Sequence, residues 1–156
     1  MPQTERLNHS KSDDEDTAEL HRLLRGVPIF YRLGDDSLKV LLEIGRRVTF
    51  PSQTIIITEG GSGSELHLIL RGLVSVRKKG KEIARLGRGQ FFGEMAFLDD
   101  LPARRTADVF SIEETDCLEI PGSSWYTYLR QNPDAAIEVI RTLAHRLREA
   151  NEARAD

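Results

Sequence analysis

Between Arg46 and Ile120 the chain alternates apolar and polar residues with a period of two, and glycines interrupt the pattern at short intervals. Alternation of this kind, rich in β-branched residues, is typical of half-buried β-strands. Many short strands in close succession predict a barrel, a roll or a sandwich for residues 46–121. The expected strands are Val48–Phe50, Thr54–Thr58, Leu66–Leu70, Leu73–Val76, Ile83–Leu86, Val109–Ile112 and Thr115–Ile120.

The chain before the strands is expected to hold a tail and a helical segment. Residues 1–16 are polar and end in the acidic run Asp13–Asp16, a composition typical of a flexible tail. Within residues 17–45, leucines recur at helical spacing and predict helices over Thr17–Arg25 and Ser37–Ile44. These helices would flank the strands within one globular domain.

Residues 122–156 are expected to form C-terminal helices. The first carries Trp125, a core anchor, and stops before Pro133, which opens a last helix to about Arg154. In that helix apolar residues recur at alternating spacings of four and three, which is typical of a coiled-coil seam about two heptads long. This stripe either packs on the roll of its own chain or pairs with a second copy. Its residues are Ala136, Ile140, Leu143, Leu147 and Ala150.

Short polar residues at two helix starts predict side-chain caps. Asp35 or Asp36 would accept hydrogen bonds from the first backbone N–H groups of the helix over 37–44. Ser123 or Ser124 would do the same for the helix that carries Trp125.

A helical turn placed among the strands predicts an anion site. Phe92–Ala96 is typical of a sharp turn into a short helix over Gly93–Leu98, whose first N–H groups lack partners within the helix. Gly93 allows close backbone approach to a ligand, and the Glu94 carboxylate would accept hydrogen bonds from hydroxyls of a sugar.

Arg105 and Thr106 complete this set. The planar guanidinium of Arg105 matches two phosphate oxygens, and Thr106 adds a hydroxyl. Arg104 is a rival for the same task, and residue type alone does not choose between the two. Taken singly, Glu94 could be a plain helix-start residue and Arg105 a surface ion-pair partner of Asp99 or Asp100.

The segment Phe92–Ala96, followed by Arg105-Thr106-Ala107, resembles the phosphate-binding cassette of the cyclic-nucleotide-binding domain family, which includes catabolite activator protein-like effector domains. Glu59-Gly60 and the pattern from Leu66 to Val76 resemble its first strands, so the likeness covers residues 27 to about 150. The resemblance implies a mainly β fold with flanking helices, a jelly-roll-like double-stranded β-roll with N-terminal helices, a short cassette helix and a long C-terminal helix.

The resemblance also implies residue roles. Glu94 would bind the ribose 2′-OH, Arg105 and the N–H groups near Met95 and Ala96 would hold the cyclic phosphate, and Thr106 would sit beside phosphate and base. The spacing from Glu94 to Arg105 is one or two residues longer than is usual in the family. The ligand-binding set is Phe92, Gly93, Glu94, Met95, Ala96, Arg105, Thr106 and Ala107, and base contacts would come from Ile137, Arg141, His145 or Arg148, with Arg141 and His145 preferred.

Composition excludes other function classes. A formal charge of −3, from 22 basic and 25 acidic residues, offers no overall attraction to nucleic acid or an anionic membrane. Cys117 is the only cysteine, no Cys/His cluster has metal spacing, and no signal or membrane-spanning run is seen, so a cytoplasmic setting is expected. The four histidines are scattered, and no catalytic arrangement emerges. We therefore expect no enzyme, metal or cofactor.

Two functions follow as hypotheses. The first is a cyclic-mononucleotide sensor, with cAMP slightly favoured over cGMP, that signals through movement of its C-terminal helix. The second is a ligand-free interaction module of the same fold that docks an effector protein or forms a homodimer through that helix. No helix-turn-helix follows the last helix, so direct DNA binding is not expected.

Overall fold

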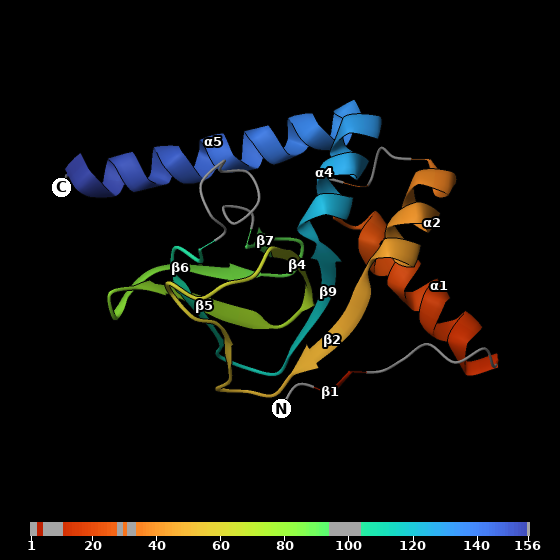
Figure 1. Cartoon of the computed structure of the whole chain (residues 1–156), viewed down its shortest axis with the longest axis horizontal. Coiled ribbons are helices and arrows are strands. Elements are labelled where there is room, and N and C mark those ends of the chain that lie inside the picture. The colour runs from red at the N-terminus through yellow and green to blue at the C-terminus, as the bar shows by residue number, and fades with distance from the viewer. Residues whose placement is uncertain (1–2, 5–10, 28–29, 31–33, 94–103, 156) are drawn as a thin grey trace.

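The computed structural model describes residues 3–4, 11–27, 30, 34–93 and 104–155. Its strands form two antiparallel sheets that build a β-roll, with helices beside it and above it (Figure 1). The strand orders are β1-β2-β9-β4-β7 and β3-β8-β5-β6. The strands are β1 (Gln3–Thr4), β2 (Arg46–Phe50), β3 (Ile55–Ile57), β4 (Glu65–Arg71), β5 (Leu73–Lys78), β6 (Lys81–Gly87), β7 (Phe91–Phe92), β8 (Asp108–Ser111) and β9 (Thr115–Pro121).

The mainly β class expected from the alternating pattern is confirmed. The expected strands correspond to β2 to β6, β8 and β9, with ends that differ by at most two residues. The short strands β1 and β7 were not expected, because two residues are too few to show a period. The β7 strand forms through pairing with β4, where Phe92 lies opposite His67 and Phe91 opposite Leu68.

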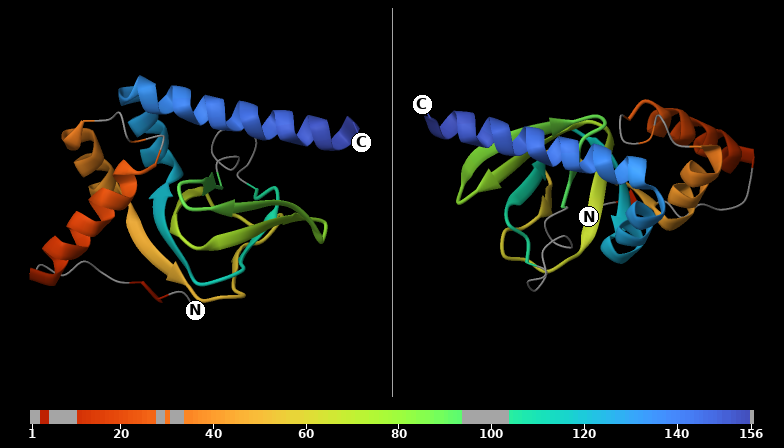
Figure 2. Two further views of the ribbon diagram at one scale, coloured as in Figure 1. Left: turned by 180° about the vertical axis from the view of Figure 1, so that it is seen from behind. Right: turned by 90° about the horizontal axis from the view of Figure 1, so that it is seen from above.

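The helices surround the roll on two sides. Helices α1 (Lys11–Arg25), α2 (Asp35–Ile44) and α4 (Gly122–Gln131) gather at one side, and α5 (Pro133–Ala155) leaves this group and runs across the top of the roll (Figures 1 and 2). Viewed from above, α5 crosses the roll along most of its length (Figure 2). None of the described helices combines the length and apolarity that a membrane crossing requires.

The alternation along β4 separates two cores. Leu66, Leu68 and Leu70 belong to the core beneath the helices, whereas Ile69 belongs to the core inside the roll. Successive side chains of a strand point to opposite faces, so one buried strand serves both. Because both faces are covered, β4 is buried without interruption from Leu66 to Leu70.

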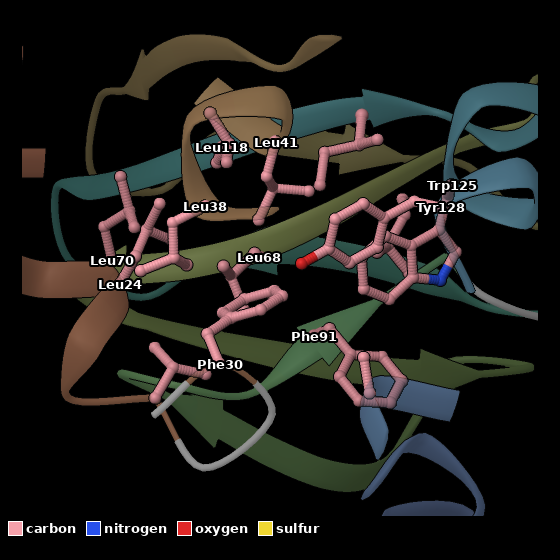
Figure 3. Packing of buried hydrophobic residues seen from close by; sticks show 14 of the residues in the cluster. Leu24, Phe30, Leu38, Leu41, Leu68, Leu70, Phe91, Leu118, Trp125 and Tyr128 are labelled. Atoms are coloured by element: carbon pink, nitrogen blue, oxygen red, sulfur yellow. The ribbon is translucent and has the colours of Figure 1, made fainter. Parts of the chain in front are cut away.

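An aromatic group anchors the helices to the sheet (Figure 3). Trp125 meets the Phe30 ring edge to face at 6.2 Å between centroids, and stacks on Tyr128 at 5.6 Å. Trp125 is 1% exposed, so the expectation of a core anchor is confirmed. These rings fix α4, and with it the start of α5, against the outer face of the roll.

The expected tail over residues 1–16 was wrong in its extent. The β1 strand falls inside it and pairs with β2 at the sheet edge, and α1 already begins at Lys11. The acidic run therefore lies within the N-terminal part of a helix, which the polar composition of this segment did not indicate.

The expected side-chain caps were also wrong. Asp35 and Asp36 lie inside the first turn of α2, and Gly34 occupies the cap position without a side-chain hydrogen bond. Ser123 and Ser124 lie inside α4, which begins directly after Pro121. With Pro121 at the cap position, the helix begins two or three residues earlier than a cap at either serine predicts.

The stripe expected on the last helix packs on its own chain only in part, through Leu143. Ile140 and Leu147 are 64% and 63% exposed, while Ala135 and Val139 are buried and Leu143 is partly buried against them. The buried face of α5 is therefore rotated from the expected one. The alternative in which the stripe pairs with a second copy is taken up below.

Tyr128 gives a test of this core. Its hydroxyl is buried and has no hydrogen-bond partner among the described residues, and burial raises the pKa of Tyr128 to about 12. We expect Tyr128→Phe to stabilise the protein by about 1 kcal/mol, because it removes a buried, unpaired donor and keeps the ring. Urea unfolding measures this, with the exposed Tyr126→Phe as the control that changes little. A clear loss of stability in Tyr128→Phe would contradict the assignment.

Candidate functional site

A cavity of about 600 Å³ lies between the roll and α5. The roll contributes apolar side chains, among them Ile57, Val76 and Val109, and α5 contributes residues from Thr142 to Ala153. A volume of this size, mostly apolar and with a few polar groups, is typical of sites for small organic ligands. The elements that meet here come from both sheets and from the C-terminal helix.

Arg105 is one of the charged residues that line this cavity, together with Arg85, Arg146 and Glu149. Only 7% of Arg105 is exposed, although it carries a permanent positive charge. Its Nη1 donates to the carbonyl oxygens of Glu65 at 3.0 Å and Gly93 at 3.3 Å, and its Nη2 donates to the Glu65 carboxylate at 3.1 Å. These acceptors compensate the charge and fix the plane of the guanidinium.

The structure separates the two neighbouring arginines. Arg104 is exposed and forms an isolated bridge with Ser62, whereas Arg105 turns inward and lines the cavity. The extended backbone causes this, since successive side chains point to opposite sides. Of the two candidates, the structure brings only Arg105 to the site.

The glycine-rich loop after β3 contacts Arg105 through its backbone. The Gly60 N–H donates to the Arg105 carbonyl, and the Arg105 N–H donates to the Gly61 carbonyl, both at 2.8 Å. A Cβ on Gly63 would come within 3.0 Å of the Arg105 guanidinium. The loop therefore fixes the backbone of Arg105 through these two hydrogen bonds. The glycine cluster was the only sequence feature that could have indicated this contact, and its spacing matches no known phosphate-binding motif.

Most other predicted residues on the roll side also reach the cavity. Phe92, Gly93, Thr106 and Ala107 line it together with Arg105. The predicted residues Glu94, Met95 and Ala96, the expected cassette helix, and Asp99 and Asp100 fall within residues 94–103, which lie outside the described residues. Glu65 was missed, because its contact with Arg105 depends on where β4 lies relative to a loop 40 residues later.

Of the four residues proposed for base contacts, one lines the cavity and three do not. His145 lines the cavity, and its Nε2 lies 3.0 Å from Oε1 of Glu149, another lining residue. Arg141 does not line it and instead donates to Glu138 at 2.7 Å. Ile137 and Arg148 are exposed on other faces of α5. The rotation of α5 described above explains the difference.

Arg146 connects α5 to the edge of the site. Its Nη2 donates to the carbonyl oxygen of Phe91, and its guanidinium lies 4.6 Å from the centroid of the Phe91 ring. Phe91 directly precedes the lining residues Phe92 and Gly93, so the helix and the turn share a contact. The apolar stripe in the sequence predicted apolar contacts for α5 and did not indicate the contact between Arg146 and Phe91.

A row of three polar side chains contacts Phe92 through its first member, His67. The inward side chains of β4, β9 and β2 place His67 beside Glu119 at 3.2 Å, and Glu119 beside Arg46 at 2.7 Å. The hydrogen bond from His67, followed by the charges of His67 and Arg46, holds the pKa of Glu119 below its usual range. The His67 ring stacks on Phe92 at 4.8 Å between centroids.

The chemistry of the cavity is that of anion binding. Arg105 offers charge-assisted donors inside an apolar space, where such bonds are strong.

The single cysteine, Cys117, lies in the core inside the roll. Burial raises the pKa of its thiol, which keeps the thiol protonated and unreactive. The described residues contain no His, Cys, Asp and Glu group that could hold a metal ion.

Comparison with known proteins agrees with this geometry. A sequence model described as "Cyclic nucleotide-binding domain" matches residues 47–132, more than half of the chain. The crystal structure of the Thermus thermophilus catabolite activator protein is similar at a TM-score of 0.68 and 31% identity, covering 81% of this chain and 61% of that one.

Two curated proteins show the range of relatives. The cyclic AMP receptor protein of Thermus thermophilus is 31% identical over 133 residues, which is 82% of this chain and 61% of that protein. Glutaminase 2 of Bradyrhizobium diazoefficiens is 33% identical over 113 residues, which is 72% of this chain and 18% of that protein. The chain thus spans less than two thirds of the length of each.

The turn at Gly93 is tested by a pair of glycine substitutions. Gly93 and Gly80 both have positive φ, at 89° and 78°, but a Cβ would lie 2.6 Å from the Glu65 carbonyl only at Gly93 and would meet nothing at Gly80. We expect Gly80→Ala to cost about 1 kcal/mol from backbone strain, and Gly93→Ala about 2 kcal/mol more from the clash. Chemical unfolding measures both, and equal losses would contradict the close approach.

Proposed function

Because the chain belongs to the cyclic nucleotide-binding domain family, we propose that its cavity binds a purine cyclic mononucleotide whose phosphate is held by Arg105. The observation that carries the proposal is the buried guanidinium at the edge of an apolar cavity of ligand size. A cyclic nucleotide combines one anionic phosphate with an apolar ring system, and the cavity offers a surface for each.

The phosphate would meet Arg105 on the cavity side. Glu65 and the Gly93 carbonyl already fix the guanidinium plane, so little conformational entropy is lost when an anion binds. Thr106 lines the same wall and would add a hydroxyl bond. From the family resemblance we further propose that Glu94 takes the ribose 2′-OH and that the N–H groups near Met95 and Ala96 reach the phosphate.

The base would lie under α5. His145, Glu149 and Thr142 line the cavity there and offer donors and acceptors to a purine edge. We keep cAMP slightly ahead of cGMP, since the similar Thermus thermophilus protein is named a cyclic AMP receptor. Thr106 is compatible with either nucleotide.

Signalling would use the position of α5. The helix spans the cavity, and its Arg146 contacts the residue next to Phe92. A ligand shifts α5 only if it binds one position of the helix more tightly than another. Contacts of the base with α5, and competition around the Phe91 carbonyl, would give that difference.

An interaction role through α5 has an observation of its own. Ile137, Ile140 and Leu147 are exposed at 46%, 64% and 63%, on one helix at spacings of three and seven. Such a stripe on a 23-residue helix matches one side of a short coiled coil with a second copy of the chain. We propose a homodimer as the partner state, either alongside ligand binding or, as the second candidate function, without it.

We propose no catalytic step and no nucleic-acid contact for the described residues. We propose a cytoplasmic location, since the sequence shows a single cysteine and no signal or membrane-spanning run. The functions of longer relatives, such as the glutaminase, belong to those proteins.

Ligand binding is tested by the neighbouring arginines. Calorimetric titration with cAMP, and separately with cGMP, should show saturable binding to the unaltered chain. Arg105→Ala should weaken it about tenfold to 150-fold, because a charge-assisted phosphate bond contributes about 1.5 to 3 kcal/mol. Arg104→Ala is the matched control and should bind normally, since Arg104 is exposed outside the cavity.

A further variant separates folding from binding. Arg105→Lys keeps the charge and loses the bidentate fork, so we expect intermediate affinity with near-normal thermal stability. Equal affinities of Arg104→Ala and Arg105→Ala would contradict the assigned phosphate contact. Absence of heat with both nucleotides, after removal of any ligand carried through purification, would favour the interaction module.

The dimer is tested on α5. Ile140→Glu and Leu147→Glu together should shift sedimentation from dimer to monomer, because two charges would be buried in the seam. Val40→Glu, another exposed apolar residue on α2, is the control and should leave the dimer intact. A monomer in the unaltered chain at all accessible concentrations would exclude the proposed pairing.

A further inference from the structure

Two arginines from different parts of the fold hold the same short stretch of backbone. Arg105, which lies shortly before β8, donates to the carbonyl oxygen of Gly93, and Arg146 on α5 donates to the carbonyl oxygen of Phe91. Phe92 lies between these two acceptors, and both arginines line the cavity with it. The stretch Phe91–Gly93 therefore brings one guanidinium of the roll and one of the last helix to the same wall.

The spacing of the two arginines suits one small anion. Two residues of extended chain span about 7 Å at most, so the two carbonyl groups keep the guanidinium groups near one another. A phosphate presents oxygens in several directions and accepts bonds of about 2.8 Å from cationic nitrogens. One phosphate in the cavity can therefore accept bonds from both arginines once Arg146 turns away from the Phe91 carbonyl.

The surroundings of Arg146 favour this exchange. Its side chain is half-buried, and its guanidinium lies 4.6 Å from the centroid of the Phe91 ring, which is 1% exposed. A guanidinium binds an anion more strongly than a neutral carbonyl oxygen, and the difference grows where water is sparse. The ring can stay in contact with the guanidinium while the bonded acceptor changes.

Arg85 is the third arginine of the cavity, and it is less suited to hold the anion. Its Nε donates to the Glu82 carboxylate at 3.0 Å, and 60% of its side chain is exposed. Water screens a charge in such a place, so Arg85 contributes to the general positive field and not to a specific bond.

The negative charge of the cavity leaves room for an anion. Glu149, the carboxylate that lines it, is 65% exposed and lies 3.0 Å from His145 on the same helix. Glu65 accepts a bond from Arg105 at 3.1 Å and does not line the cavity. The lining residues thus present three guanidinium groups and one solvated carboxylate to a ligand.

We propose that Arg146 is a second phosphate-binding residue, which exchanges the Phe91 carbonyl for the phosphate of a bound cyclic nucleotide, so that one anion joins the roll to α5. This inference rests on the proposed binding function. It gives the phosphate, and not only the base, a direct contact with the helix whose position would report the ligand.

The first test is calorimetric titration of Arg146→Gln with cAMP and with cGMP. We expect affinity to fall about threefold to tenfold, the range of one hydrogen bond made in exchange for another. The factor should be the same for both nucleotides, because they share the phosphate. Arg148→Gln removes an equal charge from an exposed site outside the cavity lining and should bind normally. Arg85→Gln should lose less affinity than Arg146→Gln.

Phosphorus NMR of bound cAMP gives a readout at the phosphate itself. We expect the bound resonance to move in Arg146→Gln and to keep its position in Arg148→Gln. An Arg146 that only held α5 in place would leave this resonance unmoved. Arg146→Lys keeps a positive charge and should retain part of the affinity, and thermal unfolding without ligand verifies that each variant is folded.

Three results would overturn the proposal. They are unchanged or tighter binding in Arg146→Gln, a loss that differs clearly between cAMP and cGMP and so indicates a base contact, and a phosphorus resonance that Arg146→Gln does not move. If Arg105→Ala weakens binding and Arg146→Gln does not, the binding function stands and this inference fails. Failure of both nucleotides to bind the unaltered chain would remove the two together.

Discussion

Arg105 carries a permanent positive charge in a place that water hardly reaches, and satisfying that charge organises the end of the roll. Glu65 and Gly93 supply three acceptor atoms, and the glycine loop after β3 bonds the arginine backbone on both sides. Glycine at 63 and 93 leaves room for the guanidinium, since a Cβ at either would press on it. Elements far apart in the chain are thereby drawn to one point.

The position of α5 follows from the packing below it. Aromatic rings of α4 and Phe30 fix the start of the helix, and Ala135 and Val139 bury its first turns. Beyond them the helix leaves the core and covers the cavity, where Arg146 contacts Phe91. The half of α5 that covers the cavity is therefore less buried than its start, as the 63% exposure of Leu147 shows, and this is compatible with the proposed signalling role of the helix.

Part of the site could be predicted because its residues are close in sequence. Phe92, Gly93, Arg105 and Thr106 were identified from residue type and spacing, and they meet in one cavity. Glu65, His67 and Arg146 could not be identified in this way, because their roles arise from strand register and helix rotation. The same limit explains why the sequence left open which face of α5 packs on the chain, and why Arg141 was preferred for a base contact although it does not line the cavity.

The sequence by itself determined the strands, the position of the helices and the chemistry available to an anion, because alternation, helical spacing and side-chain type are local properties. Only the tertiary structure decided which of two adjacent arginines is buried, which acceptors hold it, and which face of α5 covers the cavity. Those outcomes depend on how β4, β7 and α5 pack against one another, and packing is settled by contacts between residues that are distant in the chain.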